Sequence, residues 1–439
     1  MSSKQLPASV AVEQLASIIG ENAVRRWDNC TPSQQKAIQQ VNSCFQTPPS
    51  CIIYPETTEQ LARAIAQAHC HRWRLLICGS GSKLSWGGAM AGIDVVVSTE
   101  RLNQLLDHAI GDLTVTVEAG MKFSQLQSVL AKSNQFLALD PVAPESATIG
   151  GIVATANTNS LRERYGGVRD QLLGISFVRT DGQIAKAGGR VVKNVAGYDL
   201  MKLFTGSYGT LGVIAQVTFR VYPLPPSSTT VVLTGTAENI FPTAAAVRNC
   251  ALTPTQADLL SASLVSNLQL GQGPGLIVRF QSIAESVKEQ ANRLLEIGQK
   301  LGLQATLYSA TQEVDLWQRL QKSIYSAANN GAIICKIGVL PSAAFKVLTQ
   351  EEQKAVIHLS SGLGILQWEK ETTVERILQM RSLLEANKGF LTILEAPPAI
   401  KEKLDVWGYT GNALEIMRRL KAQFDPNNIL NPGRFVGGI

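Results

Sequence analysis

Three glycine-rich segments constrain the fold of this chain more than any other feature of its sequence. The first, residues 79–83, directly follows the apolar run 75–78, so the chain leaves an expected strand with almost no side chains. The second lies at 148–151 and the third at 197–212. A glycine-rich turn after a strand exposes consecutive backbone N–H groups, which cradle an anion. Together the three segments suit a long anionic ligand threaded between two subdomains.

Two familiar phosphate-binding loops do not match the first segment. A Walker loop needs Ser or Thr after its Lys, but Leu84 follows Lys83. A Rossmann fingerprint fits Gly79 and Gly81, but Leu84 stands where the third glycine belongs. Taken alone, this loop is more typical of an ordinary glycine turn, so the anion site is predicted from all three segments together.

The composition limits the kinds of partner. Charged residues make up 17% of the 439 residues, below the usual quarter, which suggests surface buried inside, between domains or against a partner. The formal net charge is +6, and the Lys and Arg residues are scattered without a basic run. Nucleic-acid binding is therefore not expected. The length indicates two or three domains.

Neither a membrane span nor a signal peptide is expected. The sequence has no apolar stretch of about 18 residues, and Glu13 and Gln14 interrupt the apolar residues near its start. We expect a cytoplasmic protein with at most peripheral membrane association.

Metal sites and disulfides are not expected either. The seven cysteines form no CxxC pair, and the four histidines include no pair at metal-ligand spacing on a helix. Reduced thiols are the plain interpretation.

The strongest boundary is the segment "PLPPSSTT" at 223–230, because its clustered prolines forbid regular structure. Short elements recur on both sides of it. The expected organisation is an N-terminal segment of two short polar helices at 1–50, a first domain at 51–223, a second at 224–408 and a C-terminal helix and tail at 409–439.

Local patterns predict several elements. Residues 75–78 and 93–99 are expected to be buried strands, and residues 113–118 alternate as a half-buried strand does. Thr57 and Gln60 have the spacing of a capping box before a helix with one apolar face.

A set of motifs in fixed order resembles one family. The motifs are "GSGSKLSWGG", "PESATIGGIVATAN", "YGGVRDQLLGISFVRTDGQI", "GGRVVKNVAGYDLMKLFTGSYGTLGVI" and "FDPNNILNPGRF". They resemble the FAD-binding oxidoreductases of the vanillyl-alcohol oxidase type, and within these most of all the FAD-binding E-type subunit of bacterial glycolate oxidases. The resemblance implies an α+β fold: a two-subdomain FAD-binding domain of the PCMH type, then an α+β cap domain with an antiparallel sheet. The C-terminal tail would return to the FAD domain.

The resemblance also implies how FAD is held. The first segment would bind the pyrophosphate through backbone N–H groups, the second would follow the ribityl chain and the isoalloxazine ring, and the third would meet the adenine end. None of the first-segment residues is His, so non-covalent FAD is expected. The implied cofactor-binding residues are Gly79, Ser80, Gly81, Ser82, Lys83, Thr148, Ile149, Gly151 and Ile214.

The motifs do not identify the catalytic residues, which stay unknown. Oxidation of a 2-hydroxy acid needs a hydride acceptor, a base and a cation for the carboxylate. Relatives carry H-x-G-D-G-N-x-H, but the corresponding residues 360–367 keep the two glycines and replace the His, Asp, Asn and His with Ser360, Leu363, Ile365 and Gln367.

Three residues are weak catalytic candidates. Arg279 and Lys336 stand mid-strand among apolar residues, where each either points out of a half-buried sheet or grips a carboxylate. Tyr198, beside Asp199, either takes part in a proton relay or belongs to a turn in which Asp199 caps a helix.

The function predicted from the sequence is an FAD-binding subunit of a glycolate oxidase complex. It would oxidise a short 2-hydroxy acid and pass electrons to a non-NAD acceptor, with a second flavin subunit and an iron–sulfur subunit as partners. The alternatives are a stand-alone FAD-dependent D-2-hydroxy-acid dehydrogenase acting on glycolate or D-lactate, and a non-catalytic scaffold with a flavin fold.

Overall fold

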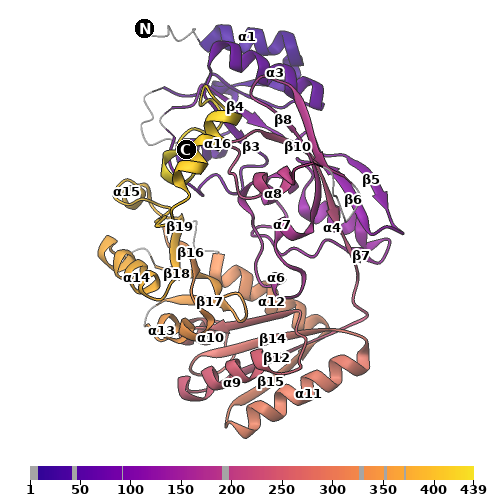
Figure 1. Ribbon diagram of the computed structural model, residues 1–439, viewed down its shortest axis with the longest axis vertical. Coiled ribbons are helices and arrows are strands. Elements are labelled where there is room, and N and C mark those ends of the chain that lie inside the picture. The colour runs from indigo at the N-terminus through magenta and orange to yellow at the C-terminus, as the bar shows by residue number, and fades with distance from the viewer. Residues whose placement is uncertain are drawn as a thin grey trace. The chain divides into compact units, whose positions relative to one another are not determined.

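The computed structural model describes residues 8–41, 47–90, 92–189, 197–325, 331–350, 353–369 and 372–439. They form two compact units (Figure 1). Unit 1 comprises Met1–Asn157, Gly167–Pro223 and Thr410–Ile439, and unit 2 comprises Thr158–Gly166 and Leu224–Tyr409. The short excursion Thr158–Gly166 into unit 2 is a feature that no sequence pattern indicated.

The first sheet of unit 1 carries the strand that leads into the first glycine segment. Its order is β1 (Val24–Arg26), β2 (Cys51–Ile53), β4 (Val95–Ser98) and β3 (Leu75–Cys78). β2 and β3 run parallel to β4, and β1 runs antiparallel to β2. The predictions for β3 and β4 are confirmed. The two short helices predicted within 1–50 are present as α1 (Ala8–Ile19) and α2 (Pro32–Gln39), and a short strand that was not predicted, β1, lies between them and pairs with β2.

Helix α3 (Thr58–His71) packs on this sheet with the face that the sequence predicted. The Thr57 side chain accepts a hydrogen bond from the Gln60 N–H at 3.1 Å. The Gln60 amide reaches back to the Glu56 N–H at 2.7 Å instead of closing the box on Thr57. The apolar residues Leu61, Ala64, Ile65 and Ala68 are buried.

The second sheet of unit 1 is antiparallel. Its order is β5 (Leu105–Ala109), β6 (Thr114–Glu118), β10 (Val213–Arg220), β8 (Leu172–Val178) and β9 (Ile184–Gly188). As the alternation predicted, Val115 and Val117 of β6 enter the core. Unit 1 also contains α4 (Phe123–Ala131), β7 (Gln135–Phe136), α5 (Ile149–Thr155), α7 (Val168–Gln171), α8 (Leu200–Phe204) and β11 (Tyr222–Pro223).

Unit 2 is built on one antiparallel sheet of eight strands, as the predicted fold class requires. The order is β15 (Gln304–Ser309), β12 (Ser227–Thr234), β14 (Gly275–Ser282), β13 (Gln256–Leu260), β17 (Lys354–His358), β18 (Leu363–Trp368), β16 (Ile333–Gly338) and β19 (Phe390–Glu395). β12 begins at Ser227, so the prediction that 223–230 lacks regular structure is wrong for its second half. The prolines end at Pro226, and the Ser and Thr residues after them have backbone N–H groups free to join a sheet.

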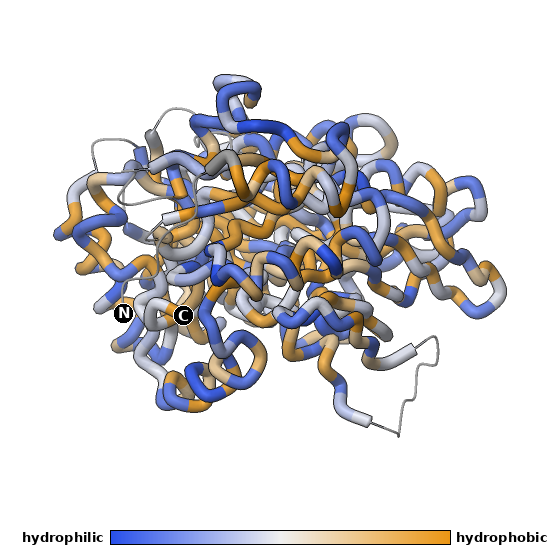
Figure 2. Tube along the Cα trace, turned by 90° about the horizontal axis from the view of Figure 1, so that it is seen from above, coloured by the Kyte–Doolittle hydropathy of each residue, from blue (hydrophilic) through white to orange (hydrophobic). Residues whose placement is uncertain are grey.

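The two faces of this sheet differ. One face is apolar and packs against α9 (Ala237–Asn249), α11 (Ala284–Lys300), α13 (Ala344–Leu348) and α14 (Val374–Ala386). The opposite face contacts α12 (Ala310–Tyr325) through polar side chains, and α6 (Arg162–Tyr165) lies against β13. The remaining helices of unit 2 are α10 (Ala262–Asn267) and α15 (Pro398–Lys401). Figure 2 shows apolar residues concentrated inside and hydrophilic residues on the outer turns.

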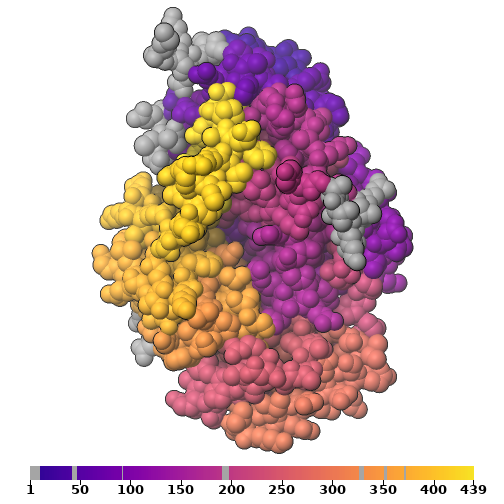
Figure 3. All heavy atoms as spheres, viewed as in Figure 1, coloured from indigo at the N-terminus to yellow at the C-terminus, as the bar shows by residue number. Residues whose placement is uncertain are grey.

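The C-terminal segment belongs to unit 1, where it lies against the strand that precedes the first glycine segment. After α16 (Leu414–Phe424), Leu430 forms a parallel bridge to Leu75 of β3. Lys421 is buried and its Nζ donates to Asp425 Oδ2 at 2.6 Å and to the carbonyls of Thr210 and Leu430 at 2.9 and 2.8 Å. Figure 3 shows this segment in yellow against the indigo and magenta atoms of unit 1.

Candidate functional site

The three glycine segments meet at one cavity inside unit 1. The predicted cofactor residues that line it are Gly79, Ser80, Gly81, Ser82, Lys83, Thr148, Gly151 and Ile214. Segments far apart in the chain therefore share one cavity, as a single long ligand would require.

Ile149 does not line this cavity. Its side chain is fully buried in the core of the second sheet, and its N–H donates to the Met121 carbonyl at 2.9 Å. Its predicted contact with the cofactor therefore has neither an exposed side chain nor a free N–H group to support it. Gly150, its neighbour, lines the cavity instead.

Close packing at one position and backbone conformation at another explain why two of the loop residues are glycines. A Cβ atom on Gly79 would stand 2.0 Å from Thr148 Oγ1, so the first and second segments touch at this point. Gly81 has a φ of +82°, a conformation that favours glycine. The small residue at position 79 thus lets the backbone of the first segment lie directly against the second.

Two residues of the C-terminal segment complete the cavity wall, and no sequence pattern indicated the role of either. The Ile77 N–H donates to Asn431 Oδ1 at 2.7 Å, while Asn431 Nδ2 donates to the Tyr208 carbonyl at 2.6 Å. Asn431 thereby joins β3 to the third glycine segment. Arg434 donates from its guanidinium to the carbonyls of Leu84, Trp86 and Gly88 and fixes the end of the first segment.

The cavity is electrostatically positive. None of the described residues that line it is Asp or Glu, and two of them, Lys83 and Arg434, are cations. Burial lowers the pKa of Lys83 to about 8 and that of Arg434 to about 10. Exposed backbone N–H groups, small residues and a net positive wall are what a diphosphate requires, so the residues present fit FAD.

The side chain of Arg279, a weak catalytic candidate, is paired with other side chains of unit 2. Its Nε lies 3.1 Å from Glu313 Oε1, and its Nη1 donates to Gln256 Oε1 at 3.2 Å. Burial lowers the pKa of Arg279, whereas the Glu313 carboxylate opposes that shift. The guanidinium is therefore neutralised by the protein, which leaves it no unpaired charge for a carboxylate ligand.

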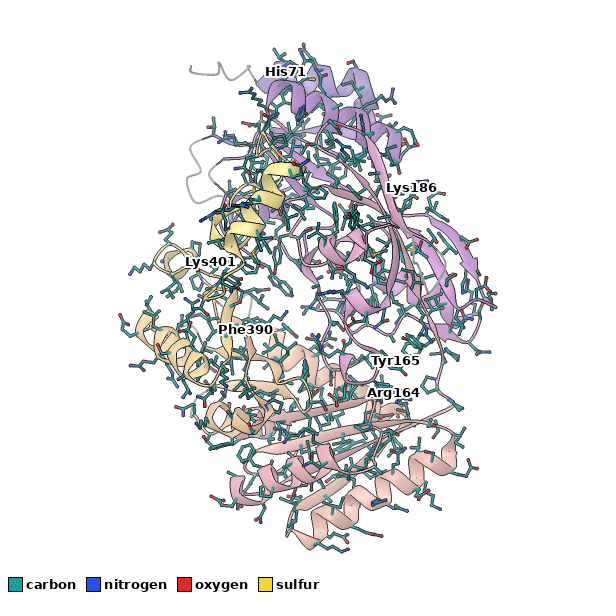
Figure 4. All side chains as sticks on the ribbon, in the orientation of Figure 1. His71, Arg164, Tyr165, Lys186, Phe390 and Lys401 are labelled. Atoms are coloured by element: carbon teal, nitrogen blue, oxygen red, sulfur yellow. The ribbon has the colours of Figure 1, made fainter. Side chains whose placement is uncertain are left out.

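Lys336, the second candidate, is different. It lies mid-strand in β16, and Nζ forms no hydrogen bond or ion pair with any residue in the described part of the chain. Burial, with a smaller contribution from the nearby Arg162 guanidinium, lowers the pKa of Lys336. Arg162 comes from α6, beside the residues Arg164 and Tyr165 that Figure 4 labels. Lys336 and Arg162 form a pair of cations with no ion pair to a carboxylate among the described residues.

A histidine–carboxylate pair on the same sheet is the main feature that sequence reasoning missed. His358 Nδ1 lies 2.6 Å from Asp258 Oδ1, and the two side chains are 6% and 1% exposed. The register pairs Asp258 with His358 and Gln256 with Arg279, so all four residues lie on the face opposite the apolar core. A carboxylate on one ring nitrogen orients the imidazole, which is how a general base is held ready.

Residues 360–367 form the turn and second strand of the β17–β18 hairpin. Ser360 bonds Glu163 through both its N–H and its hydroxyl. Gln367 is buried on the polar face, and its Oε1 has no partner in the described structure. The hairpin turn thus lacks the imidazoles of the motif, and His358 lies two residues before it.

The last predicted candidate, Tyr198, is 87% exposed. Asp199 stands at the N-cap of α8, but its side chain does not cap the helix as the sequence suggests; it accepts from Lys202 Nζ at 2.5 Å. Lys193, just before the third glycine segment, is a further candidate for a place near a phosphate, although its spacing in the sequence does not support this. It lies outside the described residues. Within the described residues, no cluster of three potential metal ligands occurs, and no helix has the length and apolarity needed to span a membrane.

Two protein families match segments of this chain that line the cavity. The FAD binding domain family matches residues 49–188, and the C-terminal domain family of FAD linked oxidases matches residues 406–435. The first match contains the first and second glycine segments, and the second contains Asn431 and Arg434.

Relatives match over different lengths. A probable mitochondrial D-lactate dehydrogenase of Danio rerio is 27% identical, over 99% of this chain and 93% of its own. Glycolate oxidase subunit GlcE of Escherichia coli K12 is 34% identical, over 41% of this chain and 49% of its own.

A solved structure of p-cresol methylhydroxylase with substrate bound superposes with a TM-score of 0.74 at 15% identity, covering 97% of this chain and 96% of that chain. This likeness confirms the predicted α+β fold class of PCMH-type FAD oxidases. Both family models match this one chain, the first over residues that line the cavity and the second over the segment that holds Asn431 and Arg434, and FAD is its cofactor.

Proposed function

We propose that this protein is an FAD-dependent dehydrogenase that oxidises a short D-2-hydroxy acid to the 2-oxo acid without NAD. The observation that supports it most is the unit 2 sheet, where one face offers a carboxylate-oriented imidazole and a pair of unneutralised cations. These are the base and the carboxylate anchor that the reaction needs. The Danio rerio relative, which matches over nearly the full length, is named a probable D-lactate dehydrogenase, and this supports the proposal.

In this proposal the glycine segments hold the cofactor in unit 1. Backbone N–H groups of residues 79–83 would bind the diphosphate, Thr148 and Gly151 would lie along the ribityl chain and the ring, and Ile214 would meet the adenine end. FAD held without a covalent bond supplies the hydride acceptor for C2 of the substrate.

His358 would accept the hydroxyl proton of the substrate as C2 loses its hydride. Asp258, whose Oδ1 lies 2.6 Å from Nδ1 of His358, would hold the imidazole in one orientation. Lys336 and Arg162 would bind the substrate carboxylate, which would also neutralise two buried like charges.

A role as a subunit of a glycolate oxidase complex is the second candidate. The absence of the histidine motif at 360–367 and the local similarity to GlcE favour it. The D-lactate dehydrogenase aligned over nearly the full length carries no subunit designation in its name, and this favours a protein that acts alone.

The test uses the purified FAD-loaded chain without oxygen. Glycolate, D-lactate, L-lactate and D-2-hydroxyglutarate are added in turn, and bleaching of the flavin absorbance is followed. We expect bleaching by at least one D-acid and none by L-lactate. Bleaching only after partner subunits are added would support the subunit role, and no bleaching under either condition would contradict both.

A further inference from the structure

Lys83 is a buried cation in the FAD cavity whose charge the protein does not use. It is 8% exposed, and Nζ is inaccessible and has no hydrogen-bond partner in the described structure. Nζ lies 5.9 Å from the centroid of the Trp86 ring, at the outer limit of a cation–π contact, which supplies neither a hydrogen bond nor a negative charge. An ammonium group buried without a hydrogen-bond partner or a counter-ion is costly, so a position of this kind indicates an absent anion.

The other cation in the cavity wall cannot take this role. The Arg434 guanidinium donates to three backbone carbonyls of residues 84–88 and is thereby occupied. None of the described residues that line the cavity has a carboxylate side chain. Lys83 is therefore the cation in the described cavity wall that a ligand can recruit without breaking an existing bond.

We propose that the Lys83 ammonium is the counter-ion of the FAD diphosphate and recognises the adenosine diphosphate half of the cofactor. Lys83 closes the 79–83 segment, whose exposed backbone N–H groups bind the same diphosphate in the proposed function. Lysine serves as a point-charge partner of phosphate in proteins. This inference goes beyond the backbone cradle, because it assigns the side chain and the half of the cofactor that it reads.

The charge state of Lys83 makes cofactor affinity depend on pH. Burial lowers the pKa of Lys83 to about 8 in the empty cavity, and a bound diphosphate raises it. Below this pKa the ammonium is charged with or without ligand, so affinity does not change through Lys83. Above it binding must take up a proton, and affinity falls as pH rises. The other ionisable groups of the wall are Cys78 and Tyr208, whose pKa values burial raises, and Arg434, which remains charged.

The test measures binding to the FAD-free chain by calorimetry, with ADP, FAD and riboflavin as ligands, for the wild type, Lys83→Met and Lys83→Arg. Lys186→Met is the matched control, because Lys186 lies on β9, outside the cavity (Figure 4). In Lys83→Met we expect the affinity for ADP and FAD to fall about 10- to 100-fold, as for loss of a charged hydrogen bond. Lys83→Arg should retain part of that affinity, and riboflavin should bind all variants alike.

Thermal unfolding of the ligand-free variants gives a second readout. Lys83→Met removes an unpaired buried charge, so the melting temperature should rise while the affinity for ADP falls. Unchanged affinity for ADP would overturn the proposal, and so would an equal loss for riboflavin, which would place Lys83 at the flavin ring. These outcomes do not depend on substrate oxidation, so they are distinguishable from failure of the proposed activity.

Discussion

Substitution of His358 gives the sharpest test of the proposed chemistry. A positioned general base typically contributes about 100- to 10,000-fold to a rate, which is about 3–5 kcal/mol in barrier height. His358→Gln keeps an amide N–H that can donate to Asp258, whose carboxylate is 1% exposed. The structural cost should therefore stay near that of one weakened hydrogen bond, about 1–3 kcal/mol.

The assay separates these two effects. Stopped-flow reduction of the flavin by substrate, without oxygen, reports the hydride and proton transfer directly. We expect a loss of about 100- to 10,000-fold in the reduction rate of His358→Gln with unchanged FAD content. Asp258→Asn should also reduce the rate, because the amide no longer stabilises a charged imidazole. His71→Gln, at the end of α3 in unit 1, is the control and should be silent.

One result would refute this reasoning. If His358→Gln reduced its flavin at the wild-type rate and lost only stability, the pair with Asp258 would be a structural ion pair and the base would have to lie elsewhere. A similar loss in His71→Gln would also show that the effect is not specific to the site.

Three further predictions follow from the geometry of unit 1. Gly81→Asp should abolish FAD retention, measured as flavin absorbance after gel filtration, because a carboxylate would face the diphosphate on a backbone with φ of +82°; a fully yellow variant would contradict the loop assignment. Gly79→Ala should lose about 1–3 kcal/mol of unfolding free energy in urea, since its Cβ would stand 2.0 Å from Thr148 Oγ1; the double variant with Thr148→Gly should recover part of it, and no recovery would exclude the clash as the cause. Lys421→Met should lower the unfolding free energy by about 3–5 kcal/mol, because it leaves the Asp425 carboxylate buried; a shift like that of a surface lysine, in the same urea titration, would contradict this.

Local sequence patterns were sufficient to predict several of the strands and helices of unit 1. The strand at 75–78, the helix from Thr58 and the alternation in β6 depend on period and capping, which short stretches of sequence encode directly. The strand β1 and the start of β12 were missed because each is stabilised by pairing with a distant strand and carries little pattern of its own.

The glycine segments illustrate both what could be predicted from the sequence about the site and what could not. Their backbone requirements are visible in the residues themselves, and so the anion site could be predicted from the sequence alone. Which of their neighbours line the cavity could not, and Ile149 illustrates this. It stands beside two cavity glycines, but the helix that it begins turns its side chain into the core.

The sequence by itself carried the resemblance to FAD-binding oxidases, and with it the fold class, because its motifs stand in a fixed order; the glycine-rich anion site remains a prediction from the same segments. Tertiary structure alone decided that Asn431 reaches β3 across 354 residues and that Asp258 pairs with His358 across 100. It also decided that the Lys83 ammonium is buried without a hydrogen-bond partner while Arg279 pairs with Glu313. The physical reason is that burial and pairing are properties of the assembled sheets, and no stretch of sequence specifies which distant side chain will share a low-dielectric site.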